Sequence, residues 1–239
     1  MSHVSPTGQD AISYTFDGIY EPADVARYLA AVLPWRDRPL TGRRVLGWIR
    51  GGLVAPERRA SPGWLVTINF QDLVTCQVIT LLREAGFSLS RIRAAETFYA
   101  SFFGVPKPFA FAQFWHAFPD ILTRVDGRLL SGSRGGQLAF DFLAEHAKPV
   151  LSHLEFRDET GRPRTWRPYQ GVSLKPDVQF GQPCIDGTRI PTSAIWGYIN
   201  AGDSPAFVAE SYGIEVADIE RAVHWERKLR ADLEVAAAA

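Results

Sequence analysis

The chain has 239 residues, of which 46% are hydrophobic and 22% are charged, so it holds enough apolar side chains for one core or two smaller ones. Its 26 Lys and Arg residues balance 26 Asp and Glu residues, which excludes a global attraction to nucleic acid or to a membrane. The two cysteines lie far apart in the sequence, and no apolar run approaches the ~20 residues of a membrane span. We therefore expect a cytoplasmic protein without disulfide bonds.

Two short helices are predicted near the start of the chain. Pro22 suits the first turn of a helix, and apolar residues recur at helical spacing from position 25 to 32. Thr41 is a good N-cap for a second helix over residues 42–50, which the glycines at positions 51 and 52 end. Two short helices joined by a proline-containing connector form the helix-turn-helix plan, in which the second helix enters a DNA major groove.

Basic side chains concentrate in this region. Residues 27–60 contain eight arginines and two acidic residues, which is a local surplus of six in a neutral chain. Such clustering is the electrostatic footprint of phosphate contact, and an ordinary solvated face is the alternative. The candidate DNA-binding residues are Thr41, Arg43, Arg44, Arg50, Arg58 and Arg59.

The segment LTGRRVLGWIRGGLVAP resembles the recognition helix of winged helix-turn-helix regulators of the MerR type, which commonly ends W-x-R-x-G-L. A turn over Glu57–Gly63 and a strand over Trp64–Ile68 would form a basic wing. The segment DLVTCQVITLLREAGFSLSRIRAA is similar to the continuation after that wing. The resemblance implies a DNA-binding domain over residues 14–106, without the coiled-coil dimerisation helix and effector domain of that family.

Within this continuation two longer helices are predicted. Asn69 or Asp72 caps the first, which ends at Gly86, and Ser88 or Ser90 caps the second.

The middle of the chain, residues 107–171, is expected to be a small β-rich domain. Asp126-Gly127 is a strong hairpin signal, and a second hairpin pairs Ser152–Phe156 with Arg164–Trp166. One helix is expected over Gly136–Ala147. A set of aromatic residues could line a ligand pocket, although such clusters are more often part of a core. They are Phe109, Phe111, Phe114, Trp115 and Phe118.

Three helices are predicted in the tail, residues 172–235. The first begins after Thr192 or Ser193 as N-cap and ends at Gly202, the second starts at Ser204 and ends at Gly213, and the last follows. The last helix interleaves acidic and basic residues and would repel as many phosphates as it bound, so protein contact is favoured over DNA. The candidate interface residues are Trp196, Tyr198 and Trp225.

A stretch rich in glycine and proline precedes these helices. The order of residues 180–193 suits neither a helix nor a central strand and predicts a tight, specifically shaped turn that separates the helical tail from the β-rich middle. Its structural residues are Gly181, Pro183, Gly187, Arg189 and Pro191. We expect Asp186 and Arg189 to have a structural role and to pair with the helices, and a role in an interface is the alternative.

The stretch FGQPCIDGTRIPTSAI resembles the opening motif of a small domain of bacterial antitoxins and their relatives, and the resemblance continues through Glu226. Together with the MerR-like head, it implies an antitoxin of the VapB class. Such a protein neutralises a PIN-domain ribonuclease toxin by direct contact and, as a homodimer, represses its own operon by binding operator DNA. A regulator that senses a small molecule in the aromatic middle is the alternative.

Residues for enzymatic chemistry do not gather in the sequence. The five histidines are scattered, without the spacing of a metal site, and no nucleophile elbow or phosphate-binding loop occurs. We therefore expect a protein that is not an enzyme and has no metal or cofactor, with an α+β, mainly helical fold. This fold would comprise a winged helix-turn-helix, a small antiparallel sheet and a three-helix bundle.

Overall fold

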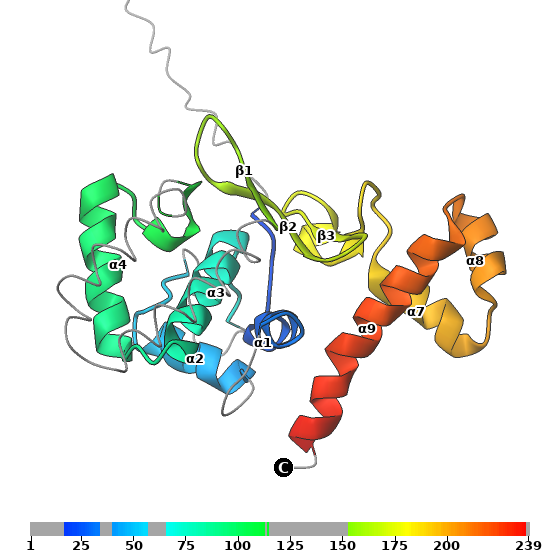
Figure 1. The fold of residues 1–239 in the computed structure, drawn as a ribbon, viewed down its shortest axis with the longest axis horizontal. Helices are drawn as coiled ribbons and strands as arrows, with labels where there is room; N and C mark the ends of the chain where they lie inside the picture. Colours follow the sequence, from blue (N-terminus) through cyan, green and yellow to red (C-terminus); the bar gives the residue numbers. More distant parts are fainter. Residues whose placement is uncertain (1–16, 34–39, 57–65, 113, 115–152, 238–239) are drawn as a thin grey trace, which may run out of the picture.

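Helices and one small sheet make up the computed structural model, which describes residues 17–33, 40–56, 66–112, 114 and 153–237 (Figure 1). The α-helices of those residues are α1 (Pro22–Ala30), α2 (Gly42–Arg50), α3 (Phe70–Glu84), α4 (Leu89–Phe103), α7 (Thr192–Ala201), α8 (Pro205–Tyr212) and α9 (Val216–Ala237). The strands are β1 (Leu154–Phe156), β2 (Pro163–Tyr169), β3 (Val172–Leu174) and β4 (Cys184–Ile185). Two short 3-10 helices are η1 (Pro108–Ala110) and η2 (Gln179–Gly181). The expected mixture of helices with a small antiparallel sheet is confirmed.

Local capping chemistry starts the first four helices. The N-cap residues of α1 to α4 are Glu21, Thr41, Asn69 and Ser88. The side chains of Thr41, Asn69 and Ser88 each accept a hydrogen bond from the backbone N–H three residues later, which satisfies one of the free donors of the first turn. These starts agree with the sequence prediction, because capping depends on neighbouring residues alone.

Helix α3 is the centre of the N-terminal half of the molecule. Every residue from Phe70 to Leu81 is buried, so the helix is covered on all sides instead of presenting one face to water. In Figure 1 it lies between α1 and α4. Its buried Asp72 forms an ion pair with Lys107 Nζ at 2.8 Å, which neutralises two charges inside the protein.

Parts of the expected wing and middle domain lie outside the described residues. These parts are the turn Glu57–Gly63 with Arg58 and Arg59, the hairpin at Asp126-Gly127, the helix over Gly136–Ala147, and the aromatics Trp115 and Phe118. The described end of the predicted strand over Trp64–Ile68 is not a strand, because it forms a single bridge between Ile68 and Tyr20. The remaining aromatics, Phe109, Phe111 and Phe114, are buried members of the core.

The four strands follow one another in space as in sequence, and each pair is antiparallel. The hairpin of β1 and β2 confirms the second predicted hairpin, with Glu155 opposite Thr165. The sheet continues past residue 171, because β2 pairs with β3 and β3 pairs with β4. The glycine-rich stretch therefore contains an edge strand, and the expectation that it separates the tail from the sheet is wrong.

The three C-terminal helices share a second hydrophobic core, which also receives Ile185 of β4. Its other buried members are Ile195, Val208, Ala209, Ile219, Ala222 and Val223. Helix α8 begins where the sequence predicts, with Ser204 as its N-cap. The prediction that Thr192 or Ser193 is the N-cap of α7 is wrong, since Pro191 occupies that position and Thr192 is fully buried in the first turn.

The beginning and the end of the chain pack together. The hydroxyl of buried Tyr20 donates to the carbonyl of Gly181 at 3.1 Å, and Ile19 N donates to the carbonyl of Phe180 at 2.8 Å. Gly181 has φ +88°, and a Cβ at this position would lie 2.1 Å from the Tyr20 hydroxyl oxygen. Glycine is therefore required by both the backbone conformation and the close approach of Tyr20.

Candidate functional site

Helix α2 presents arginines to solvent while its apolar side packs inward. Val45 and Trp48 are buried, and Arg43, Arg44 and Arg50 are exposed. The helix contains no acidic residue. Its first turn combines two arginines with the positive end of the helix dipole, so this end of α2 attracts anions.

One face of α2 has an arginine near each end and a glycine between them. Arg43, Gly47 and Arg50 follow the i, i+4, i+7 pattern and share a face of the helix. Gly47 is exposed, and a Cβ placed on it would meet nothing within 4 Å. A polyanion can therefore approach the helix backbone closely between two arginines about 10 Å apart along the axis.

The C-terminal end of α2 is held by α4. Arg93 Nη2 donates to the carbonyl oxygen of Gly51, the C-cap residue of α2, at 2.5 Å. Arg93 has no local signal in the sequence, because its partner lies 42 residues away. Of the six predicted DNA-binding residues, the structure places Thr41, Arg43, Arg44 and Arg50 on α2 and its N-cap, and Arg58 and Arg59 lie outside the described residues.

The glycine-rich turn is anchored on the sheet by Asp186. Its carboxylate accepts from Arg167 Nε at 2.7 Å and from Gly187 N at 3.0 Å, and Arg167 also pairs with Glu155 at 2.5 Å. Burial would raise the pKa of Asp186, but the hydrogen bonds from Arg167 and Ser173 hold it below its ordinary value. Asp186 thus has the structural role that we expected, although it pairs with strand β2 instead of the helices.

Arg189 differs from the other motif residues. Its backbone carbonyl accepts a hydrogen bond from the Gln179 side chain at 3.0 Å, whereas its side chain is exposed. No ion pair to its guanidinium is formed within the described part of the chain. The expected pairing of Arg189 with the helices is therefore not observed among these residues.

A buried polar cluster joins the start of α7 to α9. The Thr192 hydroxyl donates to Glu226 Oε1 at 2.5 Å, and Arg230 donates to the other oxygen of this carboxylate. Glu226 is 4% exposed, so these two donors stabilise its buried negative charge. The Arg230 guanidinium lies over the Trp196 ring at 4.6 Å from its centroid. These contacts therefore hold α9 against the start of α7.

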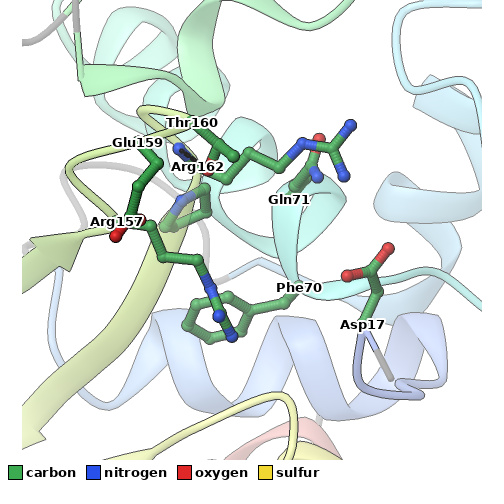
Figure 2. A pocket seen from close by; sticks show the side chains of 8 residues that line it. Asp17, Phe70, Gln71, Arg157, Glu159, Thr160 and Arg162 are labelled. Carbon is green, nitrogen blue, oxygen red and sulfur yellow. Dashed lines mark hydrogen bonds between the residues drawn. The ribbon is translucent and has the colours of Figure 1, made fainter. Parts of the chain in front are cut away.

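A small pocket lies where the first turn of α3 meets the β1–β2 turn (Figure 2). Its volume of about 220 Å³ is below the range of most small-molecule sites. Its polar lining mixes both charges and comprises Asp17, Gln71, Arg157, Glu159, Thr160 and Arg162. Among the described residues, no group of three potential metal ligands occurs. No helix in the same residues is long and apolar enough to cross a bilayer.

Residues 172–225 match the DUF433 family. The family is described as a protein of unknown function. We refer to residues 172–225 as the DUF433 segment, which includes β3, β4, α7, α8 and the first part of α9.

Similarity to a named antitoxin extends over most of the chain. The chain is 26% identical to the Mycobacterium tuberculosis (strain ATCC 25618 / H37Rv) protein "Putative antitoxin VapB45" over 87% of this chain and 93% of that protein. The crystal structure of Rv2018 from Mycobacterium tuberculosis superposes with a TM-score of 0.68 and 22% identity, over 85% of this chain and 96% of that one. The second similarity shows a shared fold.

The three predicted interface residues of the tail have different environments. Trp225 has no exposed surface and stacks near Tyr169, with ring centroids 6.3 Å apart, so its prediction as a surface anchor is wrong. Trp196 is half-buried beneath Arg230. Tyr198 is 45% exposed, and Phe207 of α8, which the sequence analysis did not single out, is 57% exposed. The exposed aromatics of the DUF433 segment are therefore Phe180 of η2, Tyr198 of α7 and Phe207 of α8.

Proposed function

We propose that this protein is the antitoxin of a type II toxin–antitoxin pair. In this proposal it neutralises a PIN-domain ribonuclease toxin by direct binding and represses its own operon as a homodimer on operator DNA. Similarity over 87% of the chain to the Mycobacterium tuberculosis protein "Putative antitoxin VapB45" supports the toxin-binding half. The protein itself has no catalytic role in this proposal.

The observation that carries the DNA-binding half is the arginine face of α2. Arg43, Gly47 and Arg50 give a cationic and sterically open strip, and Arg44 adds a charge at the N-terminal end. Helices α1 and α2 would form a helix-turn-helix with α2 as the recognition helix. The three C-terminal helices would form a bundle that binds protein, with exposed Tyr198 as an anchor.

DNA binding is tested with a duplex that contains the region upstream of the gene. In a fluorescence anisotropy titration, Arg43→Ala combined with Arg44→Ala should weaken binding about tenfold or more. The slope of log affinity against log salt should become shallower by about 1 for each lost phosphate contact. The matched control is Arg227→Ala, which removes an exposed arginine of α9 and should leave both quantities unchanged. Unchanged affinity and slope in the double variant would contradict the proposal.

Toxin neutralisation is tested with the product of an adjacent PIN-type gene. The purified protein should abolish cleavage of RNA by that nuclease at a stoichiometric ratio, and it should cleave no RNA alone. Tyr198→Ala should weaken the inhibition, whereas Ser193→Ala, at an exposed position of the same helix, should leave it intact. The absence of inhibition by the unaltered protein would refute the toxin half and leave the DNA half standing.

A further inference from the structure

Helix α4 carries two large aromatic side chains on its solvent side. Phe98 is 59% exposed and Phe102 is 67% exposed, and their rings stack with centroids 6.0 Å apart. They are four residues apart and therefore lie on one face of the helix. The adjoining face, about 100° around the helix, is turned to the core through buried Ile92 and half-buried Tyr99 and Phe103. The two exposed rings thus form an apolar face that the described chain leaves uncovered.

The rest of this face is uncharged over most of the helix. Ala94 and Ser101 are exposed beside the two rings. The one charged residue between positions 94 and 104 is Glu96, which is half-buried. A solvated helix face normally carries charges, whereas the centre of a protein interface is depleted of charge and enriched in aromatic residues. The composition of this face is that of an interface.

We propose that this face of α4 binds the same face of a second copy of the protein, with the two helices antiparallel across a two-fold axis. A surface that carries charges of one sign would repel the same surface of a second copy. The stretch from position 94 to 104 holds a single, half-buried charged residue, so this repulsion is small. The proposal deepens the proposed function, since recognition of an operator with two half-sites requires two copies.

The sequence of α4 is self-complementary in a register centred on Phe98. In that register Phe98 lies opposite its counterpart, and Ala94 lies opposite Phe102, so that a small side chain faces a large one. Arg91, seven residues before Phe98 and on the same face, lies opposite Val105 of the second copy. Val105 follows Gly104, the C-cap of α4, and the last turn of α4 has no basic residue. Each Arg91 would therefore supply a cation to the negative end of the other helix.

The size of the face indicates a weak dimer. At 59% and 67% exposure, the two phenylalanines offer about 250 Å² of surface in each copy. Twice this area is about 500 Å², which is less than the ~1,200 Å² or more of a stable interface. The dimer should therefore form at high concentration in the absence of DNA, and two adjacent half-sites should hold the copies together at lower concentration. Because Arg93 binds the end of α2, pairing through α4 would also fix the two α2 helices relative to each other.

Sedimentation of the full chain tests the dimer without DNA. The unaltered protein should show a monomer–dimer equilibrium over a concentration series, and the double variant Phe98→Glu with Phe102→Glu should remain monomeric. The control Phe207→Glu places one such charge on a phenylalanine of α8 that is 57% exposed, and it should dimerise normally. A monomer at all concentrations in the unaltered protein, or an unaltered equilibrium in the double variant, would overturn the proposal.

Single cysteines test the register even if the double variant fails to fold. The two native cysteines are buried, so Phe98→Cys adds one accessible thiol close to the proposed axis. In the presence of oxidised glutathione, Phe98→Cys should form a disulfide-linked dimer, whereas Thr97→Cys, at an exposed neighbour about 100° around the helix, should not. Equal cross-linking of the two variants would exclude this face.

DNA binding separates a failure of this proposal from a failure of the proposed function. The double variant should bind a single half-site as well as the unaltered protein and should lose the preference for paired half-sites. If the unaltered protein binds no DNA, the operator claim fails while sedimentation still decides the dimer. If the double variant loses toxin inhibition and still dimerises, α4 binds the toxin and the proposed dimer is wrong.

Discussion

Replacement of Thr192 by valine should destabilise the protein through one hydrogen bond. Thr192 has no exposed surface, and its hydroxyl donates to Glu226 Oε1 at 2.5 Å. Valine has nearly the same shape, so no cavity is created, and the buried carboxylate loses a donor. Hydrogen bonds to charged groups contribute about 1.5–3 kcal/mol, which is the expected decrease in the free energy of unfolding. For a chain of this size, the midpoint of thermal unfolding should fall by roughly 3–12 °C.

A double-mutant cycle measures this interaction directly. Urea unfolding followed by tryptophan fluorescence gives the free energy of unfolding for Thr192→Val, Glu226→Leu and both together. In the Glu226→Leu background, Thr192→Val should cost only about 1 kcal/mol, because the carboxylate is gone and the hydroxyl keeps a neutral acceptor, the Pro183 carbonyl oxygen at 3.3 Å. Ser193→Ala, at the exposed neighbouring position, should stay within about 0.5 kcal/mol of the unaltered protein. An equal cost of Thr192→Val in both backgrounds would refute the role of this hydrogen bond.

Gly181→Ala should lower the free energy of unfolding by about 2–4 kcal/mol, because it combines an unfavourable φ with a clash against Tyr20. In the Tyr20→Phe background the nearest clashing atom is absent, so the same change should cost less; additive costs would contradict this reasoning. Glu96→Gln tests a half-buried carboxyl group, since partial burial raises the pKa of Glu96 from 4.5 to about 7. The folded state then holds the proton more tightly than the unfolded state, so this contribution to stability is complete below pH 4.5 and is lost as the pH rises through 7. Thermal unfolding should show that Glu96→Gln has the same free energy of unfolding as the unaltered protein at pH 4.5. At pH 8 the free energy of unfolding of the variant should be higher by about 1–2 kcal/mol, a difference that partial solvent screening reduces. Equal stability of the two proteins at both pH values would exclude the raised pKa.

The helix boundaries could be predicted because local chemistry determines them. Thr41, Ser88 and Ser204 cap helices through bonds to backbone N–H groups three residues later, so a window of a few residues contains the whole signal. The hairpin of β1 and β2 was predictable for the same reason, since its turn lies between two short runs of strand-forming residues.

The parts that the sequence could not predict depend on distant partners. Thr192 has the chemistry of an N-cap, but its hydroxyl instead binds Glu226, 34 residues later. Trp225 has the chemistry of an interface anchor, and it is buried because strand β2 supplies Tyr169 as a neighbour. Strand β4 is two residues long and acquires its structure from pairing with β3, so no periodicity could indicate it.

The candidate DNA-binding face could be predicted in part. The three arginines of α2 are exposed as expected, because apolar residues at helical spacing determine which side of a helix is buried. The anchoring of the helix end by Arg93 required knowledge of the fold.

The continuous sheet has a consequence for the design of fragments. A cut between Gly171 and Val172, where the DUF433 segment begins, would separate β2 from β3 and leave an open strand edge on each piece. It would also divide Gly181 from Tyr20 and α9 from α1. A fragment that starts at Leu154 keeps all four strands together, and one that also retains the contact between Tyr20 and Gly181 must begin before Tyr20. The family segment is thus a stretch of shared sequence whose borders do not coincide with a separable structural unit in this chain.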